Sequence, residues 1–133
     1  QLDFKKYPVG EVSKIINDDI IIVIMLETPK AINNVEEIAS VPGIDVLLVG
    51  TNDLCMEMGI PGEFNHNDVK ESYKKVIHAC NNNDILPGMG GVYDETLMHE
   101  YIDLGMKFIL SGSDLSFLVK GAEDRLNNLK NKG

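Results

Sequence analysis

The sequence predicts an α/β fold in which four parallel strands alternate with helices. Short, continuous apolar runs recur along the chain, and such runs are typical of strands buried on both faces of a parallel sheet. Each run is followed by turn residues and then by apolar residues at helical spacing, which indicates repeated βα units. The composition, 44% hydrophobic and 25% charged, is that of an ordinary globular domain.

The first βα unit begins with the apolar run 20–26, which predicts a buried strand. Thr28 is a suitable N-cap, and Pro29 suits the first position of the helix that follows. Apolar residues at helical spacing extend this helix to residue 39, and Val41-Pro42-Gly43 ends it.

The later units follow the same pattern. Asn83 and Asp84 break one helix, Gly105 stops another, and Ser113 caps the last. The other predicted elements are a helix near 11–16, strands over 44–49, 85–89 and 107–111, and helices over 54–58, 67–82, 94–104 and 114–129.

Strict alternation implies a parallel sheet with right-handed crossovers. Two architectures fit: a small open doubly wound sheet, or part of a barrel. A complete (β/α)8 barrel takes ~250 residues, so four units make half of one. Four strands cannot close, and a lone half barrel would expose a strand edge and an apolar face. We therefore expect that this chain lacks a partner segment or pairs with another copy.

Charge and composition exclude several classes of function. The net charge of −9 argues against binding a nucleic-acid backbone, which needs clustered basic residues. No apolar run reaches the ~20 residues of a membrane-spanning helix, and no signal peptide is visible. Cys55 and Cys80 lack CxxC spacing, so we expect a reduced, cytoplasmic protein.

Two acids mark a candidate metal site. Glu27 ends the first predicted strand, and Asp53 lies just beyond the second. Neighbouring strands are ~4.8 Å apart, so these carboxylates can converge, and they repel each other unless a cation or proton intervenes. An all-oxygen donor set suits Mg²⁺ or Mn²⁺. The alternatives are that Glu27 is a helix-entry acid favoured by the dipole and that Asp53 caps an Asx-turn.

The turn at the second strand end adds a candidate anion site. The backbone N–H groups of Thr51, Asn52 and Asp53 are expected to point outward at the start of a helix, where a carboxylate would bind. A metal beside such a turn suits a 2-oxo acid, whose ketone oxygen the metal would polarise. The three histidines are not at ligand spacing, and His66 is expected to cap a helix.

Several segments resemble those of the HpcH/HpaI aldolase family, which are class II, metal-dependent pyruvate aldolases. The resemblance spans nearly the whole chain, and the combination of a glutamate with Gly-Thr-Asn-Asp-Leu at this spacing is specific. The segments are Met25-Leu26-Glu27-Thr28, Ala31-Ile32-Asn33-Asn34-Val35-Glu36-Glu37-Ile38, Val41-Pro42-Gly43-Ile44-Asp45, Gly50-Thr51-Asn52-Asp53-Leu54, Met58-Gly59-Ile60-Pro61-Gly62, Tyr101-Ile102-Asp103-Leu104-Gly105 and Gly112-Ser113-Asp114-Leu115.

The resemblance implies that residues 1–133 form the C-terminal half of a TIM-type (β/α)8 barrel. It implies that Glu27 and Asp53 bind Mg²⁺, Mn²⁺ or Co²⁺, and that the turn of Thr51, Asn52 and Asp53 holds the substrate carboxylate. The implied reaction cleaves a 4-hydroxy-2-oxo acid to pyruvate and an aldehyde through a metal-stabilised enolate. The implied assembly is a homo-oligomer, commonly a hexamer of swapped dimers.

The sequence also departs from the family pattern. Met25 stands where the family usually has glutamine, and Thr51 stands where it commonly has proline. No residue matches the family's catalytic histidine or substrate-binding arginine, which lie in the N-terminal half, so no catalytic residue is assigned in this chain. We expect the chain alone to bind metal weakly and to catalyse little. The alternatives are a citrate-lyase-β-like lyase acting on CoA thioesters, and an inactive half barrel with an assembly or binding role.

Overall fold

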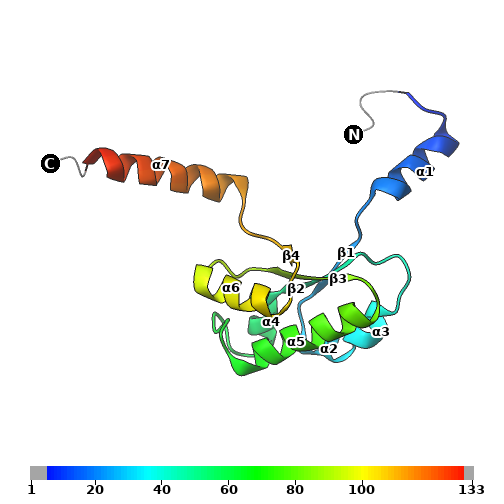
Figure 1. Ribbon diagram of the computed structural model, residues 1–133, viewed down its shortest axis with the longest axis horizontal. Coiled ribbons are helices and arrows are strands. Elements are labelled where there is room, and N and C mark those ends of the chain that lie inside the picture. Colours follow the sequence, from blue (N-terminus) through cyan, green and yellow to red (C-terminus); the bar gives the residue numbers. More distant parts are fainter. Residues whose placement is uncertain (1–5, 131–133) are drawn as a thin grey trace.

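Four parallel strands form one sheet in the order β1-β2-β3-β4 in the computed structural model, which describes residues 6–130 (Figure 1). This confirms the predicted α/β fold with parallel βα units. The strands are β1 (Val23–Leu26), β2 (Val46–Gly50), β3 (Leu86–Gly90) and β4 (Phe108–Ile109). The helices are α1 (Val9–Asp19), α2 (Pro29–Asn33), α3 (Val35–Ala39), α4 (Thr51–Glu57), α5 (Asn67–Asn82), α6 (Glu95–Leu104) and α7 (Asp114–Lys130).

The helix predicted after β1 divides into two. Thr28 caps α2 as expected, because its hydroxyl accepts a hydrogen bond from Ala31 N at 3.1 Å, and Pro29 is the first helical residue. Asn34 then leaves helical geometry, with φ −100° and ψ 12°, and α3 starts after it. The apolar spacing carried no sign of this break, because asparagine interrupts a helix through local backbone preferences and not through periodicity.

The predicted caps of the longer helices are confirmed. His66 caps α5, with its Nδ1 accepting from Asp68 N at 3.2 Å. Gly105 ends α6 as predicted, with φ +126°. Asp94, expected as the first residue of this helix, instead caps it by accepting from Leu97 N at 2.9 Å. Local sequence therefore sets where these helices begin and end.

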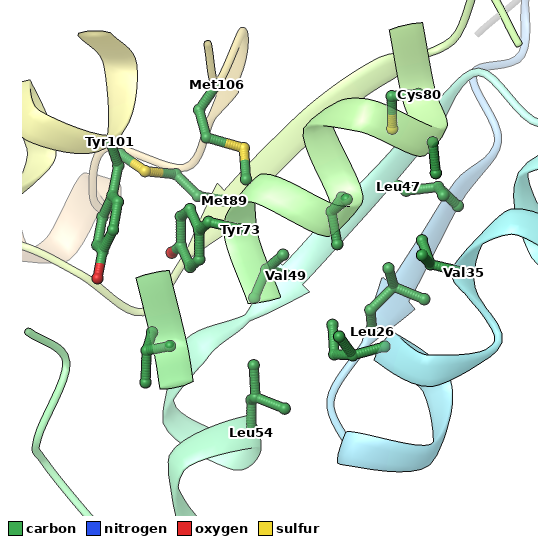
Figure 2. Close-up of a cluster of buried hydrophobic side chains, with 14 of the residues drawn as sticks. Leu26, Val35, Leu47, Val49, Leu54, Tyr73, Cys80, Met89, Tyr101 and Met106 are labelled. Atoms are coloured by element: carbon green, nitrogen blue, oxygen red, sulfur yellow. The ribbon is translucent and has the colours of Figure 1, made fainter. Parts of the chain in front are cut away.

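One face of the sheet packs against the helices and forms the core. Leu26, Leu47, Val49 and Met89 point from successive strands into this layer (Figure 2). Tyr73 of α5 packs there and is fully buried. Helices α2 to α6 lie against the sheet, so this side resembles the sheet–helix boundary of a barrel wall (Figure 1).

The opposite face is apolar and open toward the sheet edges, whereas Val46 and Leu48 of the central strand β2 are buried on it. Strand alternation places Val23, Met25, Phe108 and Leu110 on it, with Met25 52% and Leu110 44% exposed. The strand expected over 20–26 begins three residues too early, because residues 20–22 are exposed and precede β1. A continuous apolar run predicts that a segment is covered, but residues 20–22 are exposed within residues 6–130.

The first and last described helices project from the sheet (Figure 1). Neither α1 nor α7 has a buried residue, although both carry apolar side chains such as Ile16, Leu118 and Leu126. Of the helices within residues 6–130, none has the length and apolar character needed to span a membrane.

Candidate metal centre at the strand ends

Glu27 lies at the carboxyl end of β1, on the open face of the sheet. Leu26 pairs with Val49, so Glu27 comes alongside Gly50, the last residue of β2. A Cβ atom on Gly50 would lie only 2.7 Å from Glu27 Cγ and 2.9 Å from its Oε1. The missing side chain of Gly50 therefore makes the space in which Glu27 lies.

The surroundings of Glu27 favour its neutral form. Partial desolvation raises the pKa of the Glu27 carboxyl above its ordinary value of 4.5, and the nearby Asp53 raises that pKa further through its charge and through hydrogen bonding. The Glu27 carboxyl, directly after β1, and the Asp53 carboxyl, on α4, therefore lie close enough to interact. A cation bound between the two carboxylates would relieve the repulsion between them.

Helix α4 begins directly after Gly50 and presents the second acid. Gly50 occupies the N-cap position and offers no side-chain cap to the first turn. Asn52 and Asp53 are exposed, whereas the Thr51 side chain turns into the core and is fully buried. Of the three predicted substrate-binding residues, Thr51 thus has only its backbone available at the strand ends.

An open hollow of about 220 Å³ lies over these strand ends. It is lined by Met25, Asn52, Asp53, Gly91 and Tyr93, among others. Gly91 has φ +85°, and a Cβ there would come 3.1 Å from Asn52 Nδ2, so glycine permits the end of β3 to approach the turn. Gly91 and Tyr93 were not predicted as site residues, although their place directly after β3, at the same edge of the sheet, was a signal for them.

The donor set fits a hard divalent cation that keeps open coordination positions. Two carboxylates meet, and the described residues 6–130 contain no cluster of three or more His, Cys, Asp and Glu side chains able to hold a metal. Mg²⁺ and Mn²⁺ accept one or two protein carboxylates and fill their remaining positions with water or substrate oxygen. A closed structural zinc site would need more protein ligands.

Four parallel βα units with polar groups at the carboxyl ends of the strands define half of a TIM-type barrel. The chain belongs to the HpcH/HpaI aldolase/citrate lyase family, whose model matches residues 4–121. This confirms the resemblance noted in the sequence.

Among curated proteins, the chain is 36% identical over 105 residues to the 4-hydroxy-4-methyl-2-oxoglutarate aldolase cghB of Chaetomium globosum, covering 77% of this chain and 39% of that protein. It is 30% identical over 107 residues to a 4-hydroxy-2-oxo-heptane-1,7-dioate aldolase of Escherichia coli, covering 80% of this chain and 40% of that protein. The chain therefore spans about two fifths of the length of these relatives.

Solved structures give the same picture of the fold. The HpcH/HpaI aldolase from Desulfitobacterium hafniense DCB-2 superposes with a TM-score of 0.79 and 27% identity, over 99% of this chain and 51% of that one. The citrate synthase SbnG superposes with a TM-score of 0.75 over 97% of this chain and 52% of that one, and at 21% identity it shows the fold alone. The four βα units thus correspond to about half of a neighbour's chain.

Proposed function

We propose that this chain supplies the metal-binding half of a class II aldolase that cleaves a 4-hydroxy-2-oxo acid to pyruvate, or a close analogue, and an aldehyde. The observation that carries the proposal is the convergence of Glu27 and Asp53 at adjacent strand ends, in space left by Gly50. Family membership supports the reaction class, and so does the aldolase activity for which the curated relatives are named.

In this proposal Glu27 and Asp53 hold Mg²⁺, Mn²⁺ or Co²⁺. The metal would supply Lewis-acid polarisation of the 2-oxo group and stabilise negative charge that develops on its oxygen. The uncapped first turn at Thr51, Asn52 and Asp53 would orient the substrate carboxylate through backbone N–H groups. Met25 and Tyr93 would form the less polar wall of the hollow.

The proposal also requires that the open face be covered. Met25 and Leu110 are half exposed on a face that a barrel would bury, and β1 and β4 are both sheet edges. Four further βα units, corresponding to the part of the relatives that this chain does not match, would cover the face and bring the acid–base and carboxylate-binding groups. The chain would then work in the cytoplasm within a homo-oligomer.

A chimera tests the reaction class. The matching two fifths of the Escherichia coli relative would be replaced by this chain, and folding of the product verified by circular dichroism. Pyruvate release from a 4-hydroxy-2-oxo acid would be followed by coupling to lactate dehydrogenase. We expect Mn²⁺-dependent cleavage that EDTA abolishes and that falls at least ~100-fold on Glu27→Gln, because a ligand to the Lewis acid is lost.

The matched control is Glu57→Gln, which makes the same charge change on α4 at an exposed residue that does not line the hollow. This variant is expected to retain cleavage. A folded chimera whose cleavage survives both EDTA and Glu27→Gln would overturn the metal-dependent mechanism.

A further inference from the structure

The first residue of α4 is tied to the end of β3 by a buried chain of hydrogen bonds. Thr51 Oγ1 donates to the Gly90 carbonyl oxygen over 2.8 Å and lies 2.7 Å from the Tyr73 hydroxyl oxygen. Thr51 has a single hydroxyl proton, and the carbonyl takes it, so the Tyr73 hydroxyl must be the donor to Thr51. Three elements, β3, α4 and α5, therefore meet in one hydrogen-bonded network.

The Tyr73 end of this network is held rigidly. Its ring stacks on Tyr101 with centroids 3.9 Å apart and planes 22° apart, and the two rings lie side by side in Figure 2. The Tyr101 hydroxyl donates separately to the Phe64 carbonyl oxygen. Burial raises the pKa of Tyr73 to about 12, so its hydroxyl remains a donor at neutral pH.

The network lies directly behind the candidate metal centre. Gly50 gives α4 no side-chain cap, and the Thr51 hydroxyl ties the first residue of this helix to the end of β3. Asn52 and Asp53 follow on the same turn and face the hollow. Thr51 and Tyr73 are fully buried, and their hydroxyl groups bond to each other and to Gly90, not toward the hollow.

We propose that Tyr73 and Thr51 are positioning residues, which fix the Asp53 carboxylate relative to Glu27 by anchoring the start of α4 to the end of β3. The inference rests on the proposed function in assigning Glu27 and Asp53 to a metal. The Tyr73 and Thr51 hydroxyl groups form successive hydrogen bonds, and each bond strengthens the other. We therefore expect loss of either hydroxyl to loosen the first turn of α4.

The test measures the turn and the metal separately in the 133-residue chain. Amide ¹⁵N relaxation gives order parameters for Asn52 and Asp53, and electron paramagnetic resonance of free Mn²⁺ gives its dissociation constant. The variants are Thr51→Val, Tyr73→Phe and the conservative Thr51→Ser. Tyr101→Phe is the matched control, because it removes the hydroxyl of the other stacked ring, which bonds Phe64 and not Thr51.

We expect Thr51→Val to lower the order parameters of Asn52 and Asp53 from about 0.85 toward about 0.6. The same variant should weaken Mn²⁺ binding ~10-fold or more, in the range seen when a partner of a metal ligand is lost. Tyr73→Phe, which leaves the bond to Gly90 intact, should weaken Mn²⁺ binding a few-fold and carries the test if Thr51→Val does not fold. Thr51→Ser should restore both readouts.

Unchanged order parameters of Asn52 and Asp53 in Tyr73→Phe and Thr51→Val would overturn the inference. A decrease of the same size in Tyr101→Phe would also overturn it, because that result would indicate a general loss of packing. If the unmutated chain binds no Mn²⁺, the order parameters still decide whether the two residues position the turn. That failure of binding would count against the proposed function instead.

Discussion

Gly50→Ala perturbs the candidate metal centre with the smallest possible change. The added Cβ would lie 2.7 Å from Glu27 Cγ, so the Glu27 side chain must retreat by at least about 0.7 Å to reach the nearest ordinary van der Waals distance, near 3.4 Å. Gly50 has φ −81°, which alanine adopts without strain, so the backbone need not move. Metal–oxygen distances tolerate only about 0.2 Å, and the displacement exceeds this several-fold.

We therefore expect Gly50→Ala to fold and to bind Mn²⁺ at least ~10-fold more weakly than the unmutated chain, equivalent to about 1.4 kcal/mol. The assay is a Mn²⁺ titration followed by electron paramagnetic resonance, with urea unfolding of each variant measured in parallel. Glu27 is partly exposed and can rotate outward, so the free energy of unfolding without metal should change by less than about 1 kcal/mol.

Gly88→Ala provides the control. It places the same methyl group on the same face of the sheet, 3.0 Å from Val46 Cγ1 and 3.1 Å from the Phe108 carbonyl oxygen, away from Glu27. This control should lose stability, by about 1–3 kcal/mol, without losing Mn²⁺ affinity in the folded molecules. Gly50→Ala with undiminished Mn²⁺ affinity would refute the placement of Glu27 in the metal site.

Three further predictions follow from the same structure. The folded chain holds the Glu27 proton more tightly than the unfolded chain does, so ionised Glu27 costs stability above the raised pKa and the cost vanishes below about pH 4.5. Without metal, Glu27→Gln should therefore become progressively more stable than the unmutated chain as pH rises above 4.5, and with saturating Mn²⁺ the unmutated chain should be the more stable. A difference in the free energy of unfolding in urea that stays constant across pH would contradict this. Cys55 and Cys80 are fully buried free thiols, and burial raises the pKa of both, that of Cys80 to about 11. Neither thiol should therefore react with Ellman's reagent at pH 8 until the chain is unfolded. Rapid reaction of the folded chain would contradict their burial. The 133-residue chain alone should release pyruvate from a 4-hydroxy-2-oxo acid at under ~1% of the rate of the folded chimera, because the half barrel leaves the site open to water. Full activity from the chain alone would contradict this expectation.

Local patterns were enough to predict the parallel units and the two carboxylates. Apolar runs ending in turn residues placed β2 within two residues and β3 within one residue of their observed bounds, since strand and cap signals are carried by neighbouring residues. The convergence of Glu27 and Asp53 followed from the spacing of adjacent parallel strands.

Features that depend on distant partners could not be predicted in this way. The Thr51 side chain turns inward because Tyr73, 22 residues away, and the end of β3 supply its hydrogen-bond partners. Gly50 reads in sequence as a turn glycine, yet its role is to leave space for Glu27, which only the strand register reveals. Residues 20–22 are apolar but exposed. Their apolar character alone does not tell which other segment would cover them.

The most direct test of the metal site is the position of bound manganese. Crystals of the chain soaked in MnCl₂ would be measured at a wavelength where manganese scatters anomalously. We expect one strong anomalous peak between Glu27 and Asp53, about 2.0–2.5 Å from a carboxylate oxygen of each residue. A structure in which manganese binds elsewhere, or in which these two carboxylates stay apart with no peak between them, would contradict this expectation.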